Sequence, residues 1–198
     1  MDYTTLTDQA VVELAIKGRE TAYRELLRRY QRPVLSLIHR IVRDRELAED
    51  LAQDTFVKVL NALDRYQPEF KLSSWIFKIA HNTALDSLRK REVPTLSLDG
   101  APDALTADAQ EATRPMIASD EQSPVDFTAG REIGVQIEAA LAQIRPEYRT
   151  AVTLYHIEGF AYEEIAETMD LPLGTVKTFI HRARKELKTQ LAHLRAEA

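Results

Sequence analysis

Residues 171–187, LPLGTVKTFIHRARKEL, combine a tight turn, a helix start and a dense group of positive charges. At 3.6 residues per turn, the apolar residues fall on one side of a helix and form a buried stripe: Val176, Ile180, Ala183 and Leu187. Thr175 is predicted to be the N-cap of this helix. The other polar and basic side chains point away from the stripe, so the candidate contact residues of this helix are Thr175, Lys177, Thr178, His181, Arg182 and Lys185.

An acidic helix precedes the basic one. Its apolar residues recur at helical spacing, at Tyr162, Ile165, Ala166 and Met169, and the turn DLPLG at 170–174 follows them. A short helix, a turn and a basic second helix make a helix-turn-helix, whose second helix enters the major groove of DNA. The alternative is a solvated basic face on an ordinary bundle helix. The separation of acidic and basic charge onto different helices favours DNA binding.

The chain as a whole is acidic, with a net charge of −5 over 198 residues. Counting Lys and Arg against Asp and Glu, residues 1–92 carry 16 and 14, residues 93–130 carry 1 and 7, and residues 131–198 carry 9 and 10. The segment charges are therefore +2, −6 and −1, which sum to −5. Because the middle segment is also rich in proline and lacks a sustained periodicity, it is predicted to be an acidic linker.

Both flanking modules are predicted to be helical. In residues 1–92, the first helical segment is expected on both sides of Pro33, where a break or kink is predicted. Two further helices are expected, over 44–63 and over 74–91. The second module is expected to begin its first helix near Arg131, to start a new one at Pro146 and to end that one at Gly159. The fold class is therefore all-α, with two small helical domains, 1–92 and 131–198, joined by the long acidic linker 93–130.

Several function classes find no support in the composition. The chain has no cysteine, so disulfides and thiolate metal sites are excluded and a reducing, cytoplasmic location is expected. No apolar run is long enough to span a membrane, and the first ten residues are acidic and polar, unlike a signal peptide. The five histidines show no ligand-like pairing and no phosphate-binding glycine loop is present. We therefore expect no metal, no cofactor and no enzymatic activity.

Three stretches resemble one known family. Residues 162–187, YEEIAETMDLPLGTVKTFIHRARKEL, resemble region 4 of the extracytoplasmic-function (ECF, or group 4) sigma factors, the part that reads the −35 promoter element. Residues 44–60, DRELAEDLAQDTFVKVL, resemble sigma region 2.2, and residues 73–92, SSWIFKIAHNTALDSLRKRE, resemble regions 2.3 and 2.4. The resemblance implies an alternative sigma factor that binds core RNA polymerase, recognises the −35 and −10 elements and opens promoter DNA.

The resemblance also implies contact residues in the first module. Asp50, Gln53 and Asp54 would bind the β′ clamp helices of core polymerase, and a carboxylate–amide–carboxylate cluster suits an arginine-rich partner. The −10 DNA would be opened and an unpaired base captured near the loop 70–74. The residues implied in these −10 contacts are Phe70, Lys71, Ser73, Ser74, Lys78, Asn82, Arg89 and Lys90. Trp75 is instead predicted to be core, because it lies four residues before Ile79.

In the second module, region 4 would contact the polymerase β flap, and an anti-sigma factor is an implied regulatory partner. Family members commonly have Arg where this chain has Phe179, which lies about 60° from the buried stripe. We predict partial burial of Phe179, and contact with a thymine methyl group is the alternative.

Two rival functions remain open. One is a two-domain helical transcriptional activator that is not a polymerase subunit. The other is an interaction protein that captures an anti-sigma factor. The region 2 resemblance argues against the first and the intact DNA-reading helix against the second.

Overall fold

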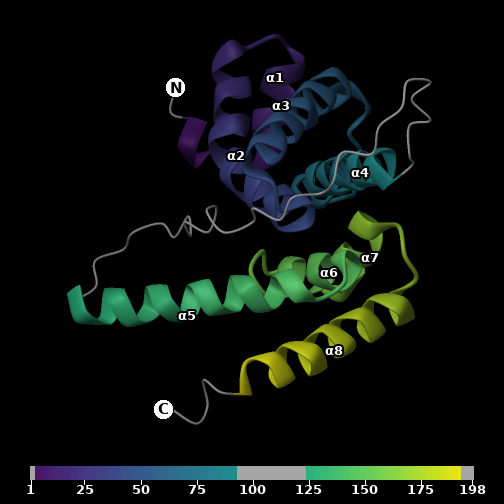
Figure 1. Cartoon of the computed structure of the whole chain (residues 1–198). Helices are drawn as coiled ribbons and strands as arrows, with labels where there is room; N and C mark the ends of the chain where they lie inside the picture. The colour runs from purple at the N-terminus through teal and green to yellow at the C-terminus, as the bar shows by residue number, and fades with distance from the viewer. Residues whose placement is uncertain (1–2, 93–123, 193–198) are drawn as a thin grey trace, which may run out of the picture.

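The computed structural model describes residues 3–92 and 124–192, without the side chains of residue 92 and residues 124–132. In these residues the chain forms eight α-helices and two short 3-10 helices, and no strand. The prediction of an all-α fold is confirmed. In Figure 1, helices α1 to α4 form one bundle and α5 to α8 lie below it as a second one.

The first bundle contains α1 (Asp8–Ile16), α2 (Glu20–Val42), α3 (Arg45–Asn61) and α4 (Leu72–Glu92). The 3-10 helices Tyr3–Thr5 and Leu63–Arg65 precede α1 and follow α3. Side chains of Thr7 and Asp44 accept backbone hydrogen bonds and cap α1 and α3.

Helix α2 runs through Pro33, so the chain does not break there as one reading of the sequence suggested. A proline inside a helix costs about 3 kcal/mol through its missing N–H and its ring clash. Here the helix buries apolar side chains on both sides of the proline, including Leu26, Tyr30, Val34 and Leu37. This burial offsets the local cost.

The second bundle contains α5 (Pro124–Gln143), α6 (Pro146–His156), α7 (Tyr162–Met169) and α8 (Leu173–Gln190). Helix α5 begins at Pro124, so residues 124–130, predicted as linker, are helical, and the rest of the predicted linker, 93–123, lies outside the described residues. Helix α6 ends at His156, three residues before Gly159, the residue predicted to end it, and Gly159 has a φ of 72° in the following turn.

Thr175 is not the N-cap of α8, which contradicts the sequence prediction. The cap position is Pro172, and the Thr175 N–H already donates to the Pro172 carbonyl at 2.9 Å within the first turn. Asp170 takes the left-handed conformation with φ of 56°, which ends α7 and lets α8 start before Thr175.

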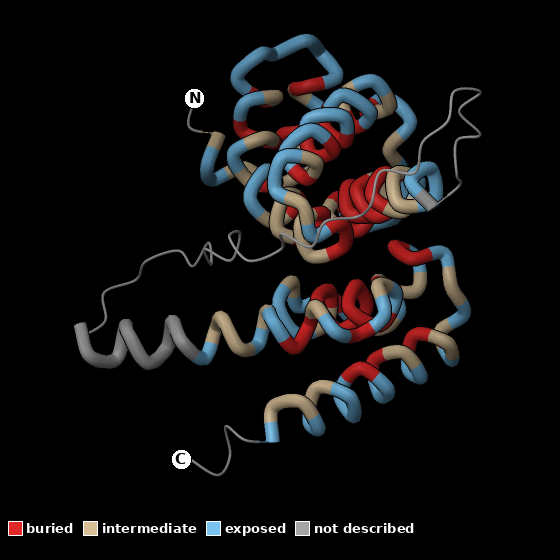
Figure 2. The backbone as a smooth tube through the Cα atoms, viewed as in Figure 1, coloured by how far each residue is buried: buried red, intermediate tan, exposed pale blue. Residues whose placement is uncertain are grey.

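The two bundles pack against each other along α4 and α7, and along α2 and α6. One apolar core continues from the first bundle into the second, and the rings of Phe77 and Phe160 meet across the boundary at 5.2 Å. Figure 2 shows buried segments on the facing sides of both bundles. The sequence suggested two modules on a tether, and the structure places these two bundles in contact through a shared apolar core.

A buried arginine strengthens this junction. The Arg149 guanidinium donates hydrogen bonds to three carbonyls at the end of α5 and the turn after it, those of Leu141, Ala142 and Ile144, at 2.7 to 3.1 Å. It also donates to the Arg40 carbonyl of α2 at 2.5 Å. The Arg40 side chain in turn pairs with Glu138 of α5 at 2.6 Å. These contacts satisfy carbonyls at the end of α5 and connect it to the first bundle.

Candidate polymerase and promoter interfaces

Helix α3 exposes the acidic cluster that was predicted to bind polymerase. Asp50, Gln53 and Asp54 are exposed, while Leu51, Ala52 and Thr55 on the other side of the helix are buried. The three polar groups therefore share one open face.

Val57 extends this face by one turn, because it lies seven residues after Asp50, and it is 56% exposed. Sequence reasoning missed this residue. The available signal was an apolar residue outside the buried stripe of α3 and in register with the acidic cluster. We call Asp50, Gln53, Asp54 and Val57 the α3 face.

The loop before α4 is held in a defined shape. The Tyr66 hydroxyl donates to the Phe70 carbonyl at 2.6 Å, and the Phe70 side chain is 44% exposed. Trp75 is half-buried, and its ring lies 5.5 Å from that of Tyr66. Phe70 is therefore the aromatic side chain of this loop that is available to a DNA base, while Trp75 packs on the core as predicted.

Ser74 is a sequence-predicted DNA contact that the structure buries. Its residue is only 3% exposed, and its hydroxyl has no hydrogen-bond partner. The Ser74 carbonyl faces the second bundle, where the Thr168 hydroxyl of α7 approaches it at 3.4 Å. The prediction that Ser74 points outward is wrong, because Ser74 is buried where α4 contacts α7.

Two predicted lysine contacts are also engaged by α7. Lys71 pairs with Glu164 at 2.5 Å, and Lys78 lies 3.7 Å from Asp170. Glu164 also accepts a hydrogen bond from the Ala161 N–H at 2.7 Å, which fixes it at the start of α7. The pKa of the Glu164 carboxyl is lowered: burial opposes this shift, and the hydrogen bonds from Lys71 and Ala161 outweigh it. Two carboxylates of the second bundle thus pair with Lys71 and Lys78, the lysines that were predicted to contact the −10 DNA.

The remaining predicted −10 contacts lie along the rest of α4. Ser73 is half-buried, and Asn82, Arg89 and Lys90 are exposed. Arg89 lies 3.5 Å from Asp86, a weak surface pair that leaves the guanidinium accessible. The −10 residues are therefore divided between a covered N-terminal part of α4 and an open C-terminal part.

Helix α8 presents its predicted DNA face to solvent. Lys177, Thr178, His181, Arg182 and Lys185 are exposed, and Thr175 is half-buried. The Thr178 hydroxyl donates to the Gly174 carbonyl at 2.9 Å, which fixes the orientation of its side chain. Val176, Ile180 and Ala183 are buried as predicted, whereas Leu187, the fourth residue of the predicted stripe, is half-buried.

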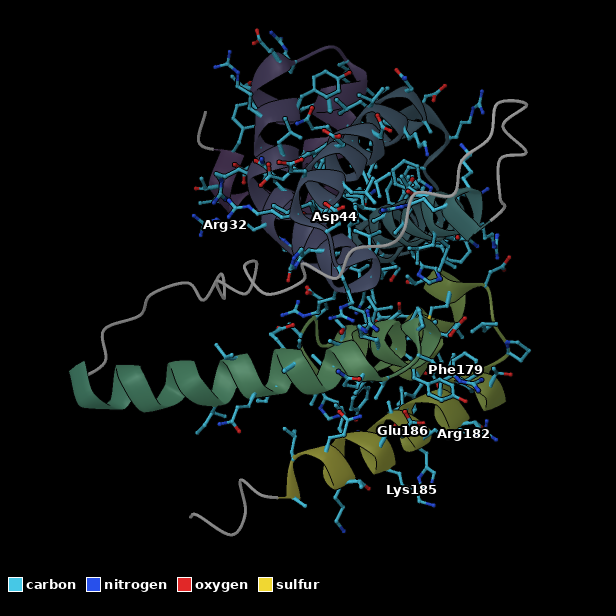
Figure 3. The ribbon with its side chains drawn as sticks, viewed as in Figure 1. Arg32, Asp44, Phe179, Arg182, Lys185 and Glu186 are labelled. Carbon is cyan, nitrogen blue, oxygen red and sulfur yellow. The ribbon has the colours of Figure 1, made fainter. Side chains whose placement is uncertain are left out.

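Phe179 is half-buried, as predicted, and packs against Tyr148 of α6 with ring centroids 5.0 Å apart. The Tyr148 hydroxyl accepts a hydrogen bond from Arg182 at 2.9 Å. Arg184 turns toward α6, where it donates to His156 at 3.1 Å and covers the Tyr155 ring at 5.0 Å. Figure 3 labels Phe179, Arg182 and Lys185 along this part of α8.

Among the described residues, no three His, Asp or Glu side chains gather in a way that could hold a metal ion. No helix in residues 3–92 and 124–192 is long and apolar enough to cross a bilayer.

Comparison with known proteins gives two family matches and a set of full-length relatives. Sigma-70 region 2 matches residues 26–93, and Sigma-70 region 4 matches residues 134–187. The ECF RNA polymerase sigma factor SigW of Bacillus subtilis is 31% identical over 90% of this chain and 93% of its own length. The chain belongs to the ECF sigma factor family. The RNA polymerase sigma-H factor of Pseudomonas aeruginosa is 34% identical over 96% of this chain and 97% of its own length.

Solved structures show the same fold. The structure of CnrH in complex with the cytosolic domain of CnrY has a TM-score of 0.64 and 22% identity, and it covers 96% of this chain and 99% of that one. The match to region 2 as well as region 4 leaves no support for a DNA-binding activator that is not a polymerase subunit. As a sigma factor, the chain acts in transcription initiation and is not an enzyme.

Proposed function

We propose that this ECF sigma factor docks on core RNA polymerase through the α3 face, reads the −35 element with α8 and opens the −10 element with α4. The observation that carries the proposal is the presence of an open acidic face on α3 and an open basic face on α8 in one chain. The first suits a protein partner rich in arginine, and the second suits DNA.

On the polymerase side, the α3 face offers two carboxylates, an amide and the exposed Val57. Charge-assisted hydrogen bonds from arginines of the β′ clamp helices would use the carboxylates, and Val57 would add apolar contact. In the second bundle, a shallow groove between α5, α6 and α8 is lined by four apolar residues and three basic or imidazole side chains: Ile137, Val152, Leu187 and Leu191, with His156, Arg184 and Lys188. This groove is the proposed contact for the β flap.

On the promoter side, the two elements must be reached at once. Two turns of B-DNA separate sites by about 70 Å, whereas α4 and α7 are in direct contact. The bundles therefore have to separate before both elements are read. Separation would release Lys71 from Glu164 and Lys78 from Asp170 and make both lysines available to DNA phosphates.

An anti-sigma factor is the proposed regulatory partner. Structures with similar folds were solved as complexes of this kind, among them the sigma factor RpoE with the anti-sigma factor NepR from Bartonella quintana, with a TM-score of 0.63 and 23% identity. A protein that bound across both bundles would keep the α3 face and α8 from polymerase and promoter.

In vitro transcription tests the function directly. Core polymerase would be supplied with this chain on a library of genomic fragments, and the start sites would be sequenced. We expect start sites that depend on the chain and share −35 and −10 sequences, with permanganate-reactive thymines in the opened region. Transcription identical to that of core polymerase alone would refute the proposed function.

A further inference from the structure

Tyr148 of α6 links the core of the second bundle to the DNA-reading face of α8. It is 6% exposed and packs with Leu141, Ile144 and Val152. We propose that Tyr148 is a positioning residue that holds the Arg182 guanidinium in the orientation needed to read one base pair of the −35 element. The inference rests on the proposed function of α8 and adds a residue that does not itself touch DNA.

The Tyr148 ring is fixed from several sides. Phe179 packs against it with an interplanar angle of 55°, and the Arg145 guanidinium lies 6.0 Å from its centroid. A tyrosine ring has two side-chain torsions, and burial restricts both, so its hydroxyl is a fixed acceptor at the edge of the bundle. Phe179 of α8 therefore supports the Tyr148 ring from one side.

The hydroxyl meets the α8 face at one point. Arg182 donates one N–H of Nη1 to it at 2.9 Å, although the Arg182 side chain is otherwise exposed. A guanidinium has five N–H donors, so the Nε and Nη2 edge remains free to donate a bidentate pair to O6 and N7 of a guanine. Glu186, one turn further along α8, attracts the same guanidinium.

This arrangement has a specific consequence for recognition. A long, exposed arginine samples many rotamers, and binding must select one of them. The hydrogen bond to Tyr148 fixes one Arg182 rotamer before DNA binds. This favours contact with one base edge over contacts with phosphates at many positions along the DNA. A phenylalanine at this site would fill the same core volume without fixing Arg182.

The test measures base preference, using full-length chain assembled with core polymerase. Binding is measured on promoters that carry each base in turn at every −35 position. Arg182→Ala is expected to reduce the affinity ratio between the preferred base and the other bases about 10-fold at one −35 position. Tyr148→Phe is expected to lose at least about 3-fold at that same base pair and nothing elsewhere, and the double variant should match Arg182→Ala alone.

Tyr155→Phe is the matched control. Tyr155 is a half-buried tyrosine of the same helix whose ring stacks on Tyr162 at 4.9 Å, so its variant keeps the ring and should leave every base preference unchanged. A thermal midpoint for Tyr148→Phe close to that of the parent chain would show that the core is intact.

Two results would overturn the inference. One is an unchanged preference in Tyr148→Phe, and the other is equal weakening on all sequences, which would reduce Tyr148 to a structural residue. A parent holoenzyme with no −35 preference at all would instead refute the proposed function, and the role of Tyr148 with it.

Discussion

Helices α4 and α8 carry similar chemistry but differ in what covers them. Both present lysine, arginine and hydroxyl or amide side chains at positions expected to meet promoter DNA. The basic face of α8 is open to solvent, whereas α7 covers the N-terminal part of α4, pairs with Lys71 and buries Ser74.

The difference matches the two DNA substrates. A major groove receives a rigid helix without changing the DNA, so α8 can be preformed and exposed. Strand opening needs contacts that form only after unpairing, and the covered N-terminal part of α4 would make them only once the bundles part. Under the proposed function, the −35 contacts would be built into one bundle, while the −10 contacts would depend on the state of both.

The largest expected effect concerns binding to core polymerase, the step that we propose separates the bundles. Asp50→Arg with Asp54→Arg should reduce binding to core polymerase by at least about 100-fold, because it places repelling charge on the α3 face. Binding is measured by fluorescence anisotropy of labelled chain titrated with core polymerase.

Glu163→Arg with Glu167→Arg is the matched control, because these exposed carboxylates are also four residues apart, on α7. Both double variants should unfold at the same denaturant concentration as the parent chain, within error. Equal loss of binding in the two would mean that net charge, and not the α3 face, drives docking.

The next prediction concerns the distance between the bundles. The chain has no cysteine, so Gln67→Cys and Glu167→Cys, both at exposed positions, can be labelled selectively with a donor and acceptor pair. We expect high energy transfer in the free chain and a large decrease on adding core polymerase, because promoter elements lie about 70 Å apart. Asp50→Arg with Asp54→Arg should prevent the decrease. Unaltered transfer in the parent holoenzyme would show that the closed arrangement persists.

A third prediction compares the histidines of the two helices. Burial lowers the pKa of His81 in α4 from 6.5 to about 4, with a smaller effect from Arg89, whereas His181 in α8 is exposed. The unfolded chain then binds the His81 proton more strongly. This contribution to stability is complete above pH 6.5 and is lost as the pH falls toward 4, by at most about 3 kcal/mol.

Urea unfolding between pH 7.5 and 4.5 measures this loss. His81→Leu should flatten the pH dependence relative to the parent chain, and His181→Gln, at an exposed position, is measured beside it as the comparison variant. If His81→Leu and the parent lose stability in parallel, another group is responsible.

The smallest effect is expected at the edge of the contact between α4 and α7. The side chains of Asp170 and Lys78 are 86% and 41% exposed and lie 3.7 Å apart, so Asp170→Asn should change the free energy of unfolding by less than about 0.5 kcal/mol. Asparagine also accepts the left-handed backbone at this position. Energy transfer between the labels should be unchanged. A marked separation of the bundles in Asp170→Asn would contradict this prediction, because it would mean that this ion pair, and not the shared apolar core, holds the bundles together.

The regular patterns were predictable because they depend on neighbours in sequence. The burial of Val176, Ile180 and Ala183 and the exposure of Arg182 and Lys185 both follow from the helical period of α8. The same reasoning misplaced Ser74, because the period of one helix separates a buried side from an exposed side but does not show that a second bundle packs on the exposed side. It also misplaced the cap of α8, where the left-handed Asp170 and Pro172 start the helix earlier than Thr175.

The amino-acid sequence by itself determined that this chain is helical, that an acidic helix precedes a basic one at 162–187, and that it resembles the ECF sigma factors. Only the tertiary structure decided that α7 lies on α4 and that Tyr148 reaches Arg182. The reason is that periodicity and charge are local properties of a segment. The covering of one helix by another, 94 residues away in the case of Ser74 and Thr168, depends on how separate segments share a core.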